Sequence, residues 1–349
     1  MKILRPYLIN KIKLNNRITV APMCQYSATN GNPSNWHYGH LQQLAISGAG
    51  LLNLESTAVN SEGRITSKDL MLANNNNQTQ LKNLFNYIKS IHNIPIGIQI
   101  SHSGRKGSAE LPWVKYNYPL NKKKRWITYA PSNIQKDKGW PIPKELNIDE
   151  IKKIINDFKS SSLRAKKIGF DCLEIHMAHG YLLHQFFSPI SNKRKDAYGG
   201  NLENRCRFLF EITEQIRKIW PKNKILGARV SGDDWLTEGA NIKDCIYLVK
   251  VLKQIGLDYV CVSSGGIINK TNLALKEGYQ VHLAKKIKKE TKIITRAGGM
   301  ISNFNYAKKL IEEKSVDLIN VARRFINEPR WLLKIDKKSK IPNQYKRCL

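Results

Sequence analysis

The chain has 349 residues, 41% of them hydrophobic and 24% charged, which is ordinary for a globular protein with a sizeable core. Its formal net charge of +31 would suit a polyanionic partner, but the lysines are spread along a chain that is also rich in Asn and Ile. We therefore attribute the charge to compositional bias and expect no nucleic-acid partner. No apolar run approaches the roughly 18–20 residues of a membrane span, and no signal peptide begins the chain, so we expect a cytoplasmic protein.

Short apolar runs alternate with amphipathic segments along the chain. A hairpin is predicted over Ile3–Arg17. Eight buried strands are then predicted at Ile18–Met23, Leu51–Ala58, Ile94–Ile100, Asp171–His176, Ile225–Val230, Tyr259–Ser263, Lys292–Arg296 and Asp317–Ala322. Amphipathic helices are predicted at Asp149–Ile168, Asn201–Lys218, Lys243–Gln254, Val281–Lys289 and Asn303–Glu312. Asn147 and Glu150 have the spacing of a capping box at the start of the first of these helices.

Eight strand–helix units without a change in composition predict one (β/α)8 TIM barrel domain over residues 1–349. A doubly wound sheet is the alternative, but no Gly-x-Gly-x-x-Gly follows the first strand. A long irregular excursion, Ala109–Gly139, follows the third strand. The six cysteines form no Cys-x-x-Cys pair, which argues against zinc ribbons, iron–sulfur clusters and a disulfide framework, and we expect no metal.

Polar residues follow the predicted strands, where barrel enzymes place their chemistry. His176, His179 and Tyr181 come at the end of the fourth strand. Two imidazoles and a phenol at one mouth can hold an oxygen atom and supply a proton. The alternative is a pair of structural histidines, and a metal site lacks an obvious third ligand.

A second group of residues suggests a phosphorylated ligand. Gly298-Gly299 and Ala322-Arg323 follow the seventh and eighth strands, where barrels bind phosphate through close backbone N–H groups. Two ordinary turns are the alternative. Gln99 and Arg229, at the ends of the third and fifth strands, suit the carbonyl and nitrogen edge of a flavin ring.

Four motifs carry a resemblance to a known family, at residues 22–26, 98–106, 174–182 and 188–200. They resemble the Old Yellow Enzyme family of FMN-dependent ene-reductases. More narrowly, they resemble its bacterial NADPH dehydrogenase and xenobiotic reductase branch, which is marked by a cysteine at the position of Cys24. The similarity extends over essentially the whole chain.

The resemblance implies a ping-pong reduction of activated alkenes, such as α,β-unsaturated carbonyls, with quinones and nitro compounds as further acceptors. NADPH or NADH would reduce bound FMN, and flavin N5 would pass the hydride to the substrate. His176 and His179 would bind the substrate oxygen, Tyr181 would protonate the α-carbon, Cys24 would tune the flavin, and Tyr26 would line the substrate pocket. The expected FMN contacts are Pro22, Met23, Cys24, Ser56, Gln99, Arg229, Gly298, Gly299, Ala322 and Arg323.

The resemblance also implies a homodimer or homotetramer. Members of the branch lend a C-terminal Arg to the neighbouring subunit's substrate site, and Arg347, in a tail at about 336–349, matches it. Two departures limit the comparison. Ala322 stands where Gly is expected, and the chain ends at Cys348-Leu349 rather than with an aromatic residue.

Two other functions share some of these sequence features. A flavin-dependent, dihydrouridine synthase-like RNA reductase would share FMN, a catalytic cysteine and a basic surface. The histidine–tyrosine group and the lack of a helical RNA-binding domain after Ala322 argue against it. A non-catalytic barrel is the third possibility, and the acid–base groups at the strand ends argue against that.

Overall fold

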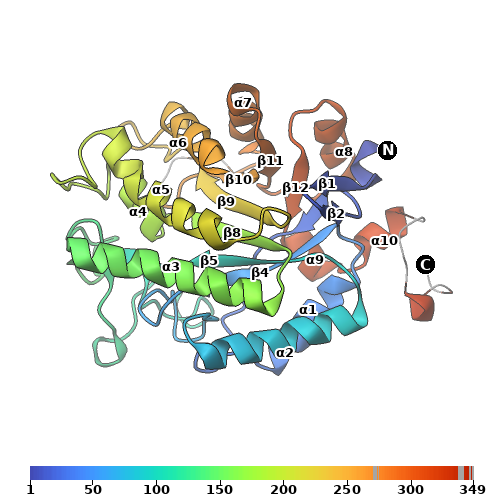
Figure 1. Cartoon of the computed structure of the whole chain (residues 1–349), viewed down its shortest axis with the longest axis horizontal. Helices are drawn as coiled ribbons and strands as arrows, with labels where there is room; N and C mark the ends of the chain where they lie inside the picture. The colour runs from blue at the N-terminus through green and yellow to red at the C-terminus, as the bar shows by residue number, and fades with distance from the viewer. Residues whose placement is uncertain (270–272, 274, 337–341, 346, 348–349) are drawn as a thin grey trace.

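A computed structural model describes residues 1–269, 273, 275–336, 342–345 and 347. Eight parallel strands close into a barrel in the order β3, β4, β5, β8, β9, β10, β11 and β12 (Figure 1). Their bounds are Ile18–Val20, Leu51–Ala58, Ile96–Ser101, Cys172–Met177, Ile225–Ser231, Tyr259–Ser263, Ile294–Ala297 and Leu318–Val321. The predicted (β/α)8 barrel is therefore confirmed.

Helices surround the barrel. The longer ones are α1 (Asn35–Ala45), α2 (Asn75–Ile91), α3 (Ile148–Ile168), α5 (Leu202–Ile219), α6 (Ile242–Ile255), α7 (Val281–Thr291) and α8 (Phe304–Glu312). The shorter ones are α4 (Leu182–Phe187), α9 (Arg323–Asn327), α10 (Trp331–Ile335) and 3₁₀ turns at Lys2–Leu4, Gly104–Lys106, Lys122–Lys124 and Asn343–Tyr345. The capping box of α3 is present, with reciprocal bonds between Asn147 and Glu150. Within the described residues, no helix is long and apolar enough to cross a membrane.

Six of the eight predicted strands differ from the structure at one or both ends, mostly by one residue, and the first and seventh show why. The first barrel strand ends at Val20, three residues early, because the following loop turns over β4, where Gln25 N–H donates to Glu55 Oε2 at 2.9 Å. The seventh starts at Ile294, because Lys292 takes a left-handed conformation (φ 55°) that ends α7. Both errors come from backbone turns that an apolar pattern does not encode.

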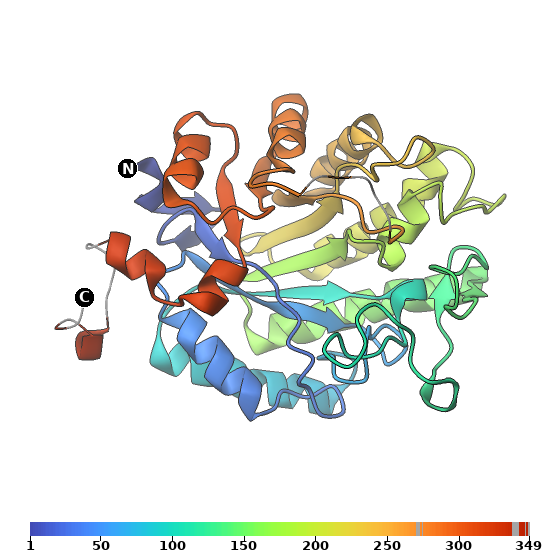
Figure 2. The same cartoon turned by 180° about the vertical axis from the view of Figure 1, so that it is seen from behind.

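The two ends of the barrel differ. The predicted hairpin forms from β1 (Tyr7–Ile9) and β2 (Ile12–Leu14). Its Ile9 and Leu14 pack with buried residues at the N-terminal ends of the strands and close that end of the barrel. The excursion after β5 lies at the opposite end, towards which the strand arrows point (Figure 2). It is irregular apart from short pieces such as β6 (Tyr129–Ala130), which pairs with β7 (Lys144–Glu145). The residues at the C-terminal ends of the strands therefore face the opening of the barrel, which we call the mouth, on the side where this excursion lies.

The barrel interior holds a fully buried ion pair. Glu174 of β8 meets Arg296 of β11, and neither side chain is exposed to solvent. Tyr259 OH donates to Glu174 Oε2 at 2.7 Å, and Gln99 Nε2 donates to Glu174 Oε1 at 2.7 Å. The Arg296 guanidinium also lies 5.0 Å from the centre of the Tyr259 ring. A buried charge is tolerated only with partners of this kind, so the pair fixes how four strands meet.

Replacing Glu174 with Ala should lower the free energy of unfolding by about 3–5 kcal/mol, because Arg296 would keep an uncompensated charge inside the barrel. Urea denaturation measures the change. The matched control is Glu313→Ala, which removes a largely exposed pair with Lys309 and should cost about 0.5 kcal/mol or less. Equal losses in the two variants would contradict the importance of the buried pair.

Candidate active site

The turn after β8 brings His176, His179 and Tyr181 together, as predicted. The ring centres of His176 and His179 lie 5.0 Å apart, and those of His176 and Tyr181 lie 4.8 Å apart. The turn reverses through Gly180 (φ 71°), where a Cβ atom would lie 2.1 Å from the carbonyl oxygen of Gly266. Only glycine allows the loop after β10 to approach this closely.

Hydrogen bonds indicate the tautomers of both histidines in the free site. Ala178 N–H donates to His176 Nδ1 at 3.2 Å, so in the neutral ring the proton is on Nε2. His176 Nε2 lies 3.3 Å from His179 Nδ1, and His179 Nε2 lies 2.6 Å from Ser263 Oγ. The Ser263 hydroxyl in turn donates to Gln280 Oε1 at 3.2 Å. We therefore assign an N–H group to Nε2 of each histidine.

The surroundings keep these groups uncharged. Burial, reinforced by the nearby Arg229 cation, lowers the pKa of both His176 and His179 well below the usual range. Burial also raises the pKa of the Tyr181 phenol, which is therefore protonated at neutral pH. At pH 7 the site thus presents neutral imidazole N–H groups beside a phenol O–H group.

Lys106 is a site residue that the sequence analysis did not single out. Its Nζ donates to the carbonyl oxygens of His179 at 2.7 Å and Gly266 at 3.2 Å, and it lies 5.1 Å from the centre of the Tyr181 ring. Burial lowers its pKa to about 7. Only the position of Lys106 within the motif at 98–106 gave any signal, because its contacts depend on two loops that are distant in the sequence.

Cys24 and Tyr26 form a wall beside Tyr181. The three side chains pack against one small apolar cluster, made of Ile65, Ala109 and Trp140. Tyr26 takes a left-handed backbone conformation (φ 49°). Burial raises the pKa of the Cys24 thiol well above its usual range, and the nearby Glu55 carboxylate adds to the effect. Cys24 is therefore a neutral thiol here rather than a thiolate.

The predicted flavin-ring residues Gln99 and Arg229 lie on β5 and β9, the two strands that flank β8. Arg229 is opposite His176 in the β8–β9 ladder, and its buried Nε has no hydrogen-bond partner among the described residues. Gln99 lies between Ser56 and Glu174 in the ladders of β5 with β4 and β8. A buried guanidinium N–H without an acceptor fits a ligand with acceptor atoms, such as the N1–C2 edge of a flavin.

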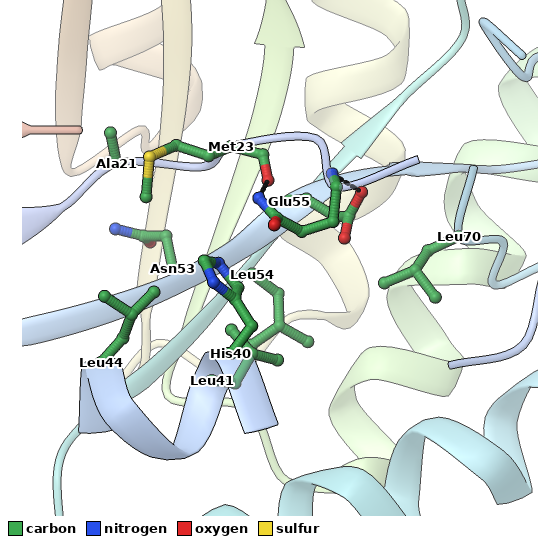
Figure 3. Close-up of a pocket in the computed structure, with 10 residues that line it drawn as sticks. Ala21, Met23, His40, Leu41, Leu44, Asn53, Leu54, Glu55 and Leu70 are labelled. Atoms are coloured by element: carbon green, nitrogen blue, oxygen red, sulfur yellow. Dashed lines mark hydrogen bonds between the residues drawn. The ribbon is translucent and has the colours of Figure 1, made fainter. Parts of the chain in front are cut away.

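Pro22 and Met23 lie on the loop directly after β3. The Met23 side chain lines a small cavity between this loop and α1, and its carbonyl oxygen accepts a bond from Gln25 Nε2 at 2.8 Å (Figure 3). The other lining residues are Ala21, His40, Leu41, Leu44, Asn53, Leu54, Glu55 and Leu70. The thioether is thus used in packing.

The predicted phosphate residues are placed at two adjacent turns. Gly299 has φ 101°, and a Cβ atom there would lie 3.0 Å from the side chain of Gln280. Gly298 precedes it after β11, and Ala322 precedes α9. The side chain of Arg323 is exposed. Ala322 departs from regular geometry (φ −114°, ψ −93°) but not into the left-handed region, so its methyl group adds no backbone strain.

Arg229 and Arg323 both bring positive charge to this part of the mouth. Burial raises the pKa of Tyr279, whereas Arg229 and Arg323 both act to lower it. Positive charge near a turn without side chains suits an anionic group such as a phosphate.

The structure does not bring Arg347 to the histidines of its own chain. Arg347 is exposed, and the nearby Tyr345 accepts a bond from Arg330 at 3.0 Å. This segment lies on the opposite side of the barrel from the excursion (Figures 1 and 2). Of the predicted tail, residues 337–341, 346 and 348–349 lie outside the described residues. Across the part of the chain that is described, no group of His, Cys, Asp and Glu has the arrangement of a metal site.

The chain is similar over most of its length to known flavin oxidoreductases. The model of the NADH:flavin oxidoreductase / NADH oxidase family matches residues 2–341. An NADPH dehydrogenase of Clostridium acetobutylicum is 38% identical over 95% of this chain and 94% of its own, and one of Bacillus subtilis is 36% identical over 94% and 92%. The solved structure of an Old Yellow Enzyme homologue from Zymomonas mobilis superposes with a TM-score of 0.81, at 22% identity over 98% of this chain and 94% of that chain.

The chain therefore belongs to the NADH:flavin oxidoreductase / NADH oxidase family, with FMN as its cofactor and NAD(P)H as its hydride donor.

Proposed function

We propose that the enzyme reduces the activated C=C bond of α,β-unsaturated carbonyl compounds, and accepts quinones and nitro compounds at the same site, in a ping-pong cycle. The observation that carries this proposal is the convergence of His176, His179 and Tyr181 on one buried mouth. A carbonyl oxygen held there is polarised by neutral N–H donors, which makes the β-carbon electrophilic.

The histidines act as hydrogen-bond donors. The 3.3 Å contact between His176 Nε2 and His179 Nδ1 is long, so a substrate oxygen can replace it as the acceptor for the His176 N–H. His179 is held in place by Ser263, whose hydroxyl lies 2.6 Å from Nε2. When this hydroxyl donates to Nε2, the ring proton of His179 is on Nδ1, where it can be donated to the substrate oxygen. Because both rings are neutral, they stabilise the developing negative charge as hydrogen-bond donors and leave the transfer of the proton to Tyr181.

Tyr181 supplies the proton. Its phenol is protonated at neutral pH, and Lys106 holds the turn that carries it through the carbonyl oxygens of His179 and Gly266. In the reduction, the Tyr181 O–H proton passes to the substrate α-carbon as the C=C bond is consumed, and solvent then returns a proton to the phenolate.

FMN, when bound, supplies the hydride chemistry. We propose that Gln99 and Arg229 hold its ring, with Pro22, Met23, Cys24 and Ser56 beside it. Gly298, Gly299, Ala322 and Arg323 would hold its phosphate. The unpartnered Arg229 Nε supports this assignment. We also propose that Arg347 serves a neighbouring subunit of a homodimer or homotetramer, since it is exposed and distant from its own mouth.

Tyr181→Phe should lower the rate of alkene reduction by about 10²–10⁴-fold, because the proton donor is lost. Oxidation of NADPH by the flavin should persist, since that step needs no proton from Tyr181. Anaerobic stopped-flow absorbance, with cyclohexenone as the acceptor, measures the two half-reactions separately. Equal loss of both would mean that Tyr181 is not the proton donor, and failure of the wild type to reduce cyclohexenone, a quinone or a nitro compound would reject the proposed function.

His176 should make the fold sensitive to acid. The unfolded chain binds a proton at His176 near pH 6.5, whereas the folded chain does so only at much lower pH, so stability is lost as the pH falls from 7 to 5. This group alone should contribute about 2 kcal/mol to that loss. Urea unfolding at both pH values should show a smaller loss for His176→Asn than for the wild type. Identical losses would mean that His176 is not buried in its neutral form.

A further inference from the structure

A closed loop projects from the excursion over the barrel mouth. We call residues 110–118 the aromatic arm. At its base Glu110 N–H donates to the carbonyl oxygen of Tyr118 at 2.8 Å, and Leu120 N–H donates to that of Ser108 at 2.8 Å. The arm is therefore pinned at both ends and has a defined position.

The aromatic arm exposes large apolar side chains. Trp113 is 65% exposed and Tyr116 is 81% exposed, with Val114 and Tyr118 exposed between and beside them. Single exposed apolar residues are common, but several within six residues of sequence form a patch. Aromatic rings presented to solvent on a pinned loop are suited to bind a flat ligand.

The patch adjoins the active site. The Trp113 ring lies edge-on to Tyr26, with 6.1 Å between ring centres and an interplanar angle of 66°. Tyr26 in turn packs in the cluster that includes Cys24 and Tyr181. Trp113 therefore lies next to the residues that line the proposed substrate pocket, and Tyr116 is on the same arm three residues on.

Lys136 links the aromatic arm to the apolar cluster that packs against Cys24, Tyr26 and Tyr181. Its Nζ bonds to Asn117 Oδ1 on the arm and lies 3.9 Å from the centre of the Trp140 ring. Trp140 belongs to the cluster against which Cys24, Tyr26 and Tyr181 pack. The exposed rings are thus held at the outer edge of the substrate pocket rather than free in solvent.

We propose that Trp113 and Tyr116 form a subsite for an aromatic substituent on the acceptor. It would make this enzyme selective for alkenes and quinones that carry an aryl group on the side facing away from His176 and His179. The inference rests on the proposed function, because it places the reacting carbonyl at the histidines. The substrate class that the aromatic arm would select is the aryl-substituted acceptor, although the reduction itself does not require the arm.

The test compares two phenols that differ by one ring. Phenol and 4-phenylphenol are titrated into the FMN-loaded enzyme, and their dissociation constants are read from the long-wavelength charge-transfer absorbance. The wild type should bind 4-phenylphenol more tightly than phenol. Trp113→Ala should reduce this preference about five- to tenfold, as expected for the loss of one aromatic contact. Trp113→Phe should retain most of it, and Ile142→Ala, which removes an apolar side chain of similar exposure (68%), should keep the wild-type ratio.

A second variant tests whether the effect of Trp113→Ala comes from a local rearrangement of the arm. Because the Glu110–Tyr118 bond brings the ends of the arm together, residues 111–117 can be replaced by Gly-Gly, and this variant should show the same reduced preference. An unchanged ratio in both Trp113→Ala and the shortened arm would overturn the subsite, and so would an equal loss of affinity for both phenols. The absence of any spectral change with either phenol in the wild type would instead contradict the proposed function.

Discussion

The buried pair of Glu174 and Arg296 is the constraint on which the site depends. A carboxylate inside the barrel is stable only when its oxygens are satisfied, and Arg296, Tyr259 and Gln99 together occupy both oxygens of Glu174. These contacts join β5, β8, β10 and β11 in one register. Glu174 and His176 lie on the same face of β8, two residues apart, so the network below the mouth also sets the direction of His176.

The electrostatics of the mouth follow from burial beside cations. Arg229 and Lys106 lie near the histidines, and burial keeps both imidazoles neutral. A neutral donor in a positive, partly dehydrated environment favours an oxygen atom that gains negative charge. The same environment leaves Tyr181 and Cys24 protonated. The site is thus arranged to stabilise an enolate-like charge while retaining a proton to give, which suits alkene reduction better than nucleophilic chemistry by the thiol.

Periodicity and local spacing predicted much of this structure. The bounds of β4 and β10 match the predicted strands, and the α3 capping box forms as expected, because these features depend on residues close in sequence. The His176–Tyr181 group was predictable for the same reason. The roles of Ser263 and Lys106 were not, since they depend on how closely the loops around Gly180 and Gly266 approach. The aromatic arm was also missed, because an irregular excursion has no periodic signal. The predicted roles of Arg347 and of the FMN-contacting residues remain predictions.

The central claim is that His176 and His179 together bind the oxygen of whatever stacks over the cofactor. The most direct measurement is the absorbance spectrum of the yellow enzyme during titration with para-chlorophenol, for the wild type and for the variant that combines His176→Ala with His179→Ala. We expect a long-wavelength charge-transfer band in the wild type and its loss in the double variant with FMN still bound. A band of unchanged intensity and affinity in the double variant would contradict the account.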